Sequence, residues 1–542
     1  MIPFTQSFIY KEALIFVAIY IIYLLVYKDN GSGKIIYLLF ITLLTFLIKL
    51  PYFTLGELNP DESEWITIVK TWNVNFNPYI NTDPHTTGVI ALIPLYLLNK
   101  LIPIHYSAIR ILGTLFDLLT IYMTYKILVQ HLKQNKKLFF IALALLYCML
   151  NATIEPDFIA YNTEHVCILV FTAIVFALYK MGIIFKHEYT DEKKQESLTL
   201  LFIAGLLMGS SLFIKVQNIP VTFILFCFVS FRFFKNKNYK LFVFLIVFCL
   251  LPVLIVLLTL YLKGSLNHFY IRYILTNLNY TSKGLNFAFV DKILYNPFHF
   301  KLKNFYPFLI LSCFAFILTI TNINKIKKAI FNKDFLFFLI ILVVTLYEII
   351  QPKNYFQHYY LLLYQPLIPL FIIYKNFEVR KATFFIILSF QFLFFWMLKR
   401  KDTDLFLYDF ATENFLYSKI IPDINLAAGL HNCDNNHIMV WGWNTRYYVY
   451  SNFLPVVRDV VNIHLFTHTG YLENYYLHSF ITDLQQSKLK KILVIDDLLT
   501  HTRFKLYKFP EFIYHYNLNK YFREITWVEH NDGYDTYVIE LL

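Results

Sequence analysis

Long apolar segments recur between Ser7 and Leu398 and dominate the pattern of this chain. A helix needs about 20 mostly apolar residues to cross a hydrocarbon core about 30 Å thick. Segments near that length predict spanning helices at residues 8–27, 35–55, 107–128, 138–153, 165–185, 198–214, 218–234, 241–262, 304–322, 335–350, 356–374 and 382–398. Residues 1–398 are therefore predicted to form an all-α polytopic membrane domain of about 12 to 13 transmembrane helices.

One further apolar segment, Thr87–Leu101, is shorter than the others and disturbs the alternation of sides. If it crossed the membrane completely, the basic connection "QHLKQNKK" would lie on the outer side, against the positive-inside rule. We therefore predict that this segment is re-entrant or short.

After Lys399 the long apolar segments stop and the period of the pattern changes. Short pieces with strand character follow one another, namely "HIMVWGW", "RYYVYS", "KILVIDD" and "YDTYVIEL", and a helical stretch "TDLQQSKLKK" lies among them. This alternation predicts a small α/β domain over residues 399–542.

The distribution of basic residues predicts which side of the membrane each loop occupies. Lysine and arginine are concentrated in six short connections of the membrane part, which the positive-inside rule places in the cytoplasm. The first external loop, residues 51–86, and the domain after residue 398 then lie on the opposite side, which is the periplasmic side if the membrane is a bacterial inner membrane. The net charge of +12 is explained by these connections, so it predicts no nucleic-acid partner.

Composition agrees with this class. The 542 residues are 58% hydrophobic and 15% charged, far from the balance of a soluble globular protein. The six cysteines give no indication of function, because their spacing shows neither a disulfide framework nor a metal-binding motif.

The first external loop contains an acidic stretch, "NPDESEW", with Asp61, Glu62 and Glu64. One interpretation is purely structural: a helix that begins with Pro60 favours carboxylates in its first turn, where they face the positive end of the helix dipole. The other is functional, because ionisable groups at the mouths of apolar helices are costly to desolvate. An amphipathic stretch from Trp65 to Asn73 follows and is expected to lie on the membrane surface.

The predicted topology gathers further ionisable residues on the same side of the membrane. Together they indicate a site for phosphate or metal chemistry, although each alone is also compatible with a hydrogen-bonded or snorkelling structural residue. These residues are Asp83, His85, Glu164, His165, Lys215, Arg272 and His358.

Several of these motifs resemble those of one enzyme family. "GELNPDESEW" and "NPYINTDPHTTG" in the first loop, "YNTEH", "FIKVQN", "HYYLLLYQPLIPL" and "VWGWNTRYYVYSNFLPVVR" are similar to segments of GT-C fold membrane glycosyltransferases. That group includes the protein O-mannosyltransferases and the lipid A aminoarabinose transferases. The resemblance covers nearly the whole chain, but the family's charged pair before two prolines is replaced here by "DPHTTGVIALIP".

The resemblance implies a membrane enzyme that moves a sugar from a polyprenyl-phosphate carrier to an acceptor glycolipid, glycan or protein on the outer face, with inversion. It implies Asp61 as general base and Glu62 as the second catalytic carboxylate. A cation would stabilise the leaving phosphate, and the candidates are Lys215, Arg272 and a histidine. A divalent metal ion stays open as a cofactor, with Glu164 and His85 as its candidate ligands.

Two other functions remain open from the sequence. A polytopic transporter or lipid flippase would use the carboxylates for ions or protons, although no inverted repeats are visible. A glycan polymerase or ligase would carry its defining residues in a late loop, whereas this chain has them early.

Overall fold

The computed structural model describes residues 4–28, 33–151, 156–184, 194–282, 333–350, 357–373, 420–434, 436–498, 507–531 and 534–542. The chain divides into two compact units that do not follow its linear order. The first unit contains residues 1–54, 110–256 and 281–406, and the second contains residues 55–109, 257–280 and 407–542. The predicted domain boundary at residues 398 and 399 lies outside the described residues.

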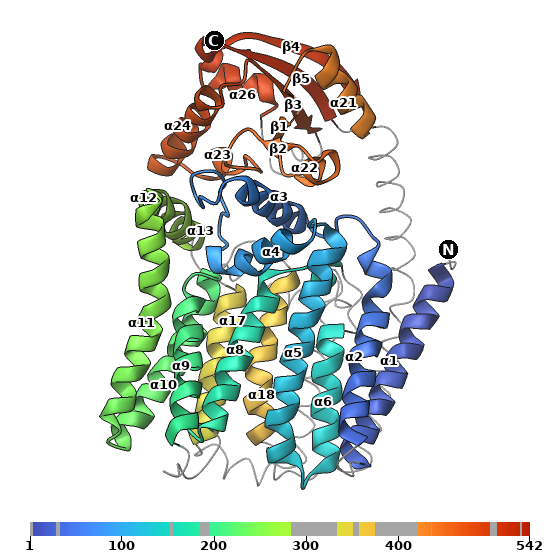
Figure 1. The fold of residues 1–542 in the computed structure, drawn as a ribbon, viewed down its shortest axis with the longest axis vertical. Helices are drawn as coiled ribbons and strands as arrows, with labels where there is room; N and C mark the ends of the chain where they lie inside the picture. The colour runs from blue at the N-terminus through green and yellow to red at the C-terminus, as the bar shows by residue number, and fades with distance from the viewer. Residues whose placement is uncertain are drawn as a thin grey trace, which may run out of the picture. The chain divides into compact units, whose positions relative to one another are not determined.

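Helices are the regular elements in the described part of the first unit, and its long helices run side by side (Figure 1). Its elements are α1 (Phe4–Tyr27), α2 (Gly33–Phe53), most of α5 (Tyr106–Leu132), α6 (Lys136–Asn151), α7 (Pro156–Ile159), α8 (Thr163–Lys180), α9 (Lys194–Ser211), η2 (Val216–Asn218), α10 (Ile219–Lys235), most of α11 (Tyr239–Leu262), α17 (Lys333–Ile350), η5 (Gln357–Leu363) and α18 (Tyr364–Ile373).

Five helices in the described part of the chain are long and apolar enough to cross a membrane. They are Gly33–Phe53, Tyr106–Leu132, Thr163–Lys180, Val216–Lys235 and Tyr239–Leu262. Shorter apolar helices occur at four other predicted spans, near residues 8–27, 198–214, 335–350 and 356–374. The predicted spans at 304–322 and 382–398 lie outside the described residues.

Glycine allows two of these helices to pack closely. A Cβ atom built on Gly209 in α9 would lie 2.0 Å from the carbonyl oxygen of Cys249 in α11, and one on Gly205 would lie 2.5 Å from the Cβ of Phe248. Apolar helices in lipid associate through such contacts between small residues and a neighbouring backbone, because lipid supplies no hydrophobic driving force. A larger side chain at position 209 would force the two helices apart.

The second unit combines short helices with one five-stranded sheet. Its helical elements are α3 (Pro60–Val74), α4 (Val89–Leu101), α12 (Leu266–Phe269), η3 (Tyr270–Leu275), most of α13 (Thr276–Ser282), α21 (Ile421–Leu430), α22 (Arg446–Ser451), α23 (His464–Thr467), α24 (Tyr471–Gln486), α26 (Phe509–His515) and η8 (Leu518–Tyr521). Helix α4 has 13 residues and is therefore about 20 Å long at 1.5 Å per residue, too short to cross a bilayer. This agrees with the prediction that the segment is short.

The strand order of the sheet is β2-β1-β3-β5-β4. Strand β1 (His437–Trp441) pairs in parallel with β2 (Leu454–Pro455) and β3 (Lys491–Asp497), whereas β5 (Tyr534–Leu541) pairs antiparallel with β3 and with β4 (Phe522–Asn531). Side chains of β1, β3 and β5 pack on α24 and α26 to form the apolar core of the domain. The predicted strands "HIMVWGW", "KILVIDD" and "YDTYVIEL" are confirmed, as is the small α/β domain.

The prediction of a strand at "RYYVYS" is wrong, because these residues form helix α22. Aromatic and β-branched residues favour strands as a propensity, but packing overrides it here. The hydroxyl of Tyr448 accepts a hydrogen bond from the backbone N–H of Val440 in β1, at 2.8 Å, and the side chain is buried. Asn452 ends the helix in the left-handed conformation, with φ of 62°.

Candidate active site

Helix α3 begins as the sequence predicts. The side chain of Asn59 accepts a hydrogen bond from the backbone N–H of Asp61, at 2.9 Å, and Pro60 occupies the first turn. This N-cap satisfies a backbone N–H that the helix leaves unpaired and fixes the direction of the first turn. Asp61 is half-buried in that turn, close to the positive end of the helix dipole.

Glu62 has a different environment from Asp61. Its side chain is fully buried and accepts a hydrogen bond from the backbone N–H of Leu58, at 3.1 Å. A glutamate three positions after an N-cap often reaches back to a backbone N–H before the helix. In the described structure, Glu62 thus helps to cap α3.

The helix is buried on most of its surface, contrary to the expected amphipathic stretch. Eight consecutive residues, Glu62 to Val69, are buried, and Trp72 donates a hydrogen bond from its indole to Thr82 at 2.6 Å. Segment Asn444–Asn452 of the C-terminal domain supplies part of the cover, since Lys70 donates to Asn452 at 3.2 Å. A single apolar face cannot account for this burial, so the stretch does not pack as an amphipathic helix, and its position at the membrane surface stays a prediction.

A second acidic residue of the loop, Glu57, also contacts the C-terminal domain. The Nε atom of Arg446 lies 3.8 Å from Glu57 Oε1, and the hydroxyl of Ser63 donates to the other carboxylate oxygen. Although burial lowers the pKa of Arg446, the charge of Glu57 outweighs this effect and raises it above its usual value. Neither Glu57 nor Arg446 was predicted from the sequence as a site residue.

His85 lies at the centre of a buried cluster. Its Nδ1 atom lies 2.7 Å from Glu64 Oε1, and its Nε2 atom lies 2.9 Å from Asp459 Oδ1. The backbone of His85 is left-handed, with φ of 50°, and its N–H donates to Asp83 Oδ1 at 2.9 Å. The imidazole of His464 lies against that of His85, with 4.3 Å between ring centroids and a tilt of 34°. Glu64, which the sequence places near the start of the helix, thus also holds His85.

Neighbouring charges shift the pKa values of His85 and Asp459 in this cluster. Burial by itself lowers the pKa of His85, but the carboxylates of Glu64, Asp83 and Asp459 outweigh it and hold the pKa well above its usual value. Burial would raise the pKa of Asp459, yet hydrogen bonding and charge from His464 and His85 hold it well below its usual value. At neutral pH this geometry favours a charged His85 between two carboxylates.

Asp83 and Arg272 form a separate ion pair. Arg272 Nη1 lies 2.5 Å from Asp83 Oδ2, and both side chains are fully buried. The guanidinium also donates to the hydroxyls of Tyr475, at 3.2 Å, and Ser479, at 2.7 Å. These contacts join the first loop, η3 and α24. The guanidinium of Arg272, a predicted candidate for binding the leaving phosphate, is therefore already held by protein groups.

The first unit holds a second cluster of predicted residues. Lys215 Nζ lies 2.5 Å from Glu164 Oε1 and 4.6 Å from the centre of the Tyr359 ring. His358 Nδ1 lies 3.0 Å from Asp157 Oδ2, and its Nε2 lies 4.0 Å from Glu164 Oε1. Glu164, Lys215 and His358 are all buried, so the structure brings these three predicted residues together.

His165 points elsewhere, although it is adjacent to Glu164 in the sequence. Its Nδ1 atom lies 2.8 Å from Asp117 Oδ1, and Lys49 Nζ lies 2.5 Å from the other oxygen of Asp117. All three side chains are buried among α2, α5 and α8. His165 therefore belongs to an ion pair between helices rather than to the Glu164 cluster.

The predicted metal ligands Glu164 and His85 belong to different compact units, and each has other partners within its own unit. A group with suitable ligand atoms occurs instead around His85. Atoms of His85, Asp459 and His464 all lie within 4.8 Å of one another, and all three residues are buried. The sequence analysis missed Asp459 and His464, because nothing local in the tail marks them as neighbours of the first loop.

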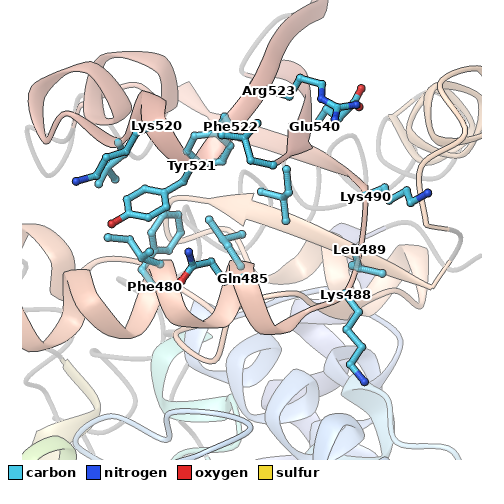
Figure 2. A pocket seen from close by; sticks show the side chains of 15 residues that line it. Phe480, Gln485, Lys488, Leu489, Lys490, Lys520, Tyr521, Phe522, Arg523 and Glu540 are labelled. Carbon is cyan, nitrogen blue, oxygen red and sulfur yellow. The ribbon is translucent and has the colours of Figure 1, made fainter.

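A cavity of about 680 Å³ opens in the C-terminal domain, beside the end of α24, η8 and β4 (Figure 2). Its lining combines aromatic side chains, among them Phe480 and Phe522, with the basic residues Lys488, Lys520 and Arg523. None of the predicted site residues lines it.

By sequence, no family model and no curated protein matches this chain. By structure, the chain is similar to ArnT from Cupriavidus metallidurans, in a crystal structure bound to undecaprenyl phosphate. The TM-score is 0.57 at 10% identity, over 94% of this chain and 98% of ArnT. The chain has a GT-C fold.

A weaker likeness is to the Archaeoglobus fulgidus oligosaccharyltransferase, in a complex with zinc and sulfate. The TM-score is 0.42 at 9% identity, over 92% of this chain and 72% of the other. The predicted architecture, a GT-C membrane domain followed by a small α/β domain, is confirmed.

Proposed function

We propose that this chain is a glycosyltransferase that moves a sugar from a polyprenyl-phosphate carrier to an acceptor on the outer face of the membrane. The observation that carries the proposal is the start of α3 in a chain with a GT-C fold. There the Asn59 cap and the buried Glu62 fix the helix, and the half-buried carboxylate of Asp61 lies between them in the chain. The ArnT structure bound to undecaprenyl phosphate supports the choice of donor.

The proposed reaction is a direct displacement with inversion. The acceptor oxygen forms a bond to the anomeric carbon while the bond from that carbon to the phosphate oxygen breaks, and the electron pair leaves with the polyprenyl phosphate. The acceptor proton passes to Asp61, because a carboxylate within hydrogen-bond reach is a suitable general base. Glu62 acts through the helix start, where it holds the first turn that carries Asp61.

Stabilisation of the leaving phosphate is assigned to Lys215. A fixed cation is worth most where charge develops in the transition state. Glu164 and the Tyr359 ring hold the ammonium group in place, and His358 lies beside Glu164. Arg272 is assigned a structural role instead, because Asp83, Tyr475 and Ser479 bind its guanidinium.

The proposed location is a bacterial inner membrane, with the first external loop and the C-terminal domain in the periplasm. The basic connections of the membrane part support this orientation. The proposed partners are the lipid-linked donor, an acceptor glycan, lipid or protein, and the surrounding lipids.

The test has two steps. Deletion of the gene is expected to remove one sugar from one class of cell-envelope glycolipid, glycan or glycoprotein, which mass spectrometry of each fraction identifies. The purified protein in detergent is then expected to restore that sugar to the truncated acceptor from a radiolabelled polyprenyl-phosphate donor. Donor binding without transfer would favour a lipid flippase, and transfer of a preassembled glycan would favour a polymerase or ligase. Either result overturns the proposal.

A further inference from the structure

The cluster around His85 contains two buried polar atoms that make no well-formed hydrogen bond in the described part of the chain. They are Asp459 Oδ2 and His464 Nδ1, which face each other as an ion pair at 3.5 Å, a long distance for a hydrogen bond. Both residues are more than nine-tenths buried. This long contact satisfies the two buried groups only weakly, so an ion bound between them would supply the missing interaction.

The neighbouring His85 directs its Nε2 atom to the same place, and a metal ion bound there would displace the proton of that nitrogen into solvent. That atom lies 2.9 Å from the other oxygen of Asp459, and one ligand atom from each of the three residues lies within 4.8 Å of the rest. Ligands bound to zinc at 2.0–2.2 Å lie about 3.4 Å apart in a tetrahedron. The three side chains therefore need to shift by about 1 Å or less to close around an ion.

Glu64 contacts the other ring nitrogen of His85. Its Oε1 atom lies 2.7 Å from Nδ1 of His85, so it fixes the ring and leaves Nε2 directed at Asp459. A histidine that binds a metal almost always donates its other ring N–H to a carboxylate or carbonyl in this way.

We propose that His85, Asp459 and His464 form a binding site for a divalent transition-metal ion, with zinc as the preferred ion and Glu64 as the residue that orients His85. Two imidazoles and one carboxylate favour zinc over calcium or magnesium, which prefer sets of oxygen ligands. The ion would join the loop after α3 to the segment before α24, which are 374 residues apart at His85 and Asp459. Its role is structural, and the proposal does not depend on sugar transfer.

The test uses the full-length protein in detergent, stripped with a chelator and then titrated with zinc. We expect one tightly bound zinc per chain by calorimetry and by elemental analysis after gel filtration. Saturation at 100 times the dissociation constant should shift the equilibrium toward the folded state about 100-fold, seen as a higher thermal midpoint. Calcium and magnesium should give no shift.

Variants distinguish zinc bound at this site from zinc bound by other histidines of the chain. His464→Gln and Asp459→Asn are expected to lose the bound zinc, and Glu64→Gln to weaken it about 10- to 100-fold. The control His478→Gln, at an exposed position on α24, should bind zinc as the wild type does. If a variant fails to fold, titration of the wild type still decides. Less than half a zinc per wild-type chain, or full binding by folded His464→Gln, would overturn the proposal.

Discussion

Arg272 and Asp83 are 189 residues apart in the chain, yet their charged atoms lie 2.5 Å apart with both side chains fully buried. The burial of both charges is costly, and the pair is tolerated because Tyr475 and Ser479 also accept from the guanidinium. This pair holds the first external loop against η3 and α24 within the second unit.

Replacement of one member of this ion pair should therefore lower the stability of the second unit strongly. Asp83→Asn leaves a buried guanidinium without its counter-charge, and we expect a loss of about 3–5 kcal/mol in the stability of the second unit. The matched control is Arg523→Gln, which breaks a pair whose arginine side chain is 68% exposed and should cost about 0–1 kcal/mol. Denaturant unfolding of the purified protein, followed by tryptophan fluorescence, measures both. Equal stability of the two variants would contradict a structural role for the pair.

Asp61→Asn tests the proposed base. Asparagine has nearly the same shape but cannot take the acceptor proton, so turnover should fall about 10²- to 10⁴-fold while folding is kept. Asp423→Asn is a close control, because Asp423 also follows a proline in the first turn of a helix, α21, and is also half-buried. Transfer of radiolabelled sugar should be near the wild-type rate in the control. A wild-type rate in Asp61→Asn would assign the base elsewhere.

Lys215→Met tests the proposed cation. Loss of the ammonium removes the charge that would stabilise the leaving phosphate and also removes the lysine partner of the buried Glu164. We expect turnover to fall at least 100-fold. Lys180→Met changes an exposed lysine at the end of α8, the helix that begins beside Glu164, and should leave transfer unchanged. Circular dichroism and gel filtration check that both variants fold; a folded, fully active Lys215→Met would remove Lys215 from the mechanism.

His268 should make the second unit sensitive to acid. Burial and the charges of Arg458 and Arg272 lower the pKa of His268 to about 4, although Asp83 acts in the opposite direction. The unfolded chain has the ordinary value of about 6.5, so between these values it binds more protons than the folded chain does. Stability is therefore complete above about pH 6.5 and falls as the pH approaches 4.

The measurement is the thermal midpoint between pH 4 and pH 8 for the wild type and His268→Gln. Glutamine keeps a polar group near Tyr475, which lies 2.5 Å from His268 Nδ1, but does not titrate. The variant should lose less of its midpoint on acidification than the wild type. Parallel curves would show that other groups cause the acid sensitivity.

The sequence by itself determined the class of the protein and much of its local structure. Apolar segments of membrane-spanning length are a local property, and so are the short apolar runs that form strands β1, β3 and β5. The start of α3 could also be predicted from the sequence, because Asn59 and Pro60 act on the backbone directly after them.

Only the tertiary structure decided which ionisable groups meet. His85 finds Asp459 across 374 residues, and Asp83 finds Arg272 across 189, so no spacing in the chain encodes either contact. It also decided that His165 and Glu164, neighbours in sequence, have separate partners, since successive positions on a helix point about 100° apart. "RYYVYS" forms a helix for a related reason: the contact of Tyr448 with β1 outweighs a weak local preference for strand.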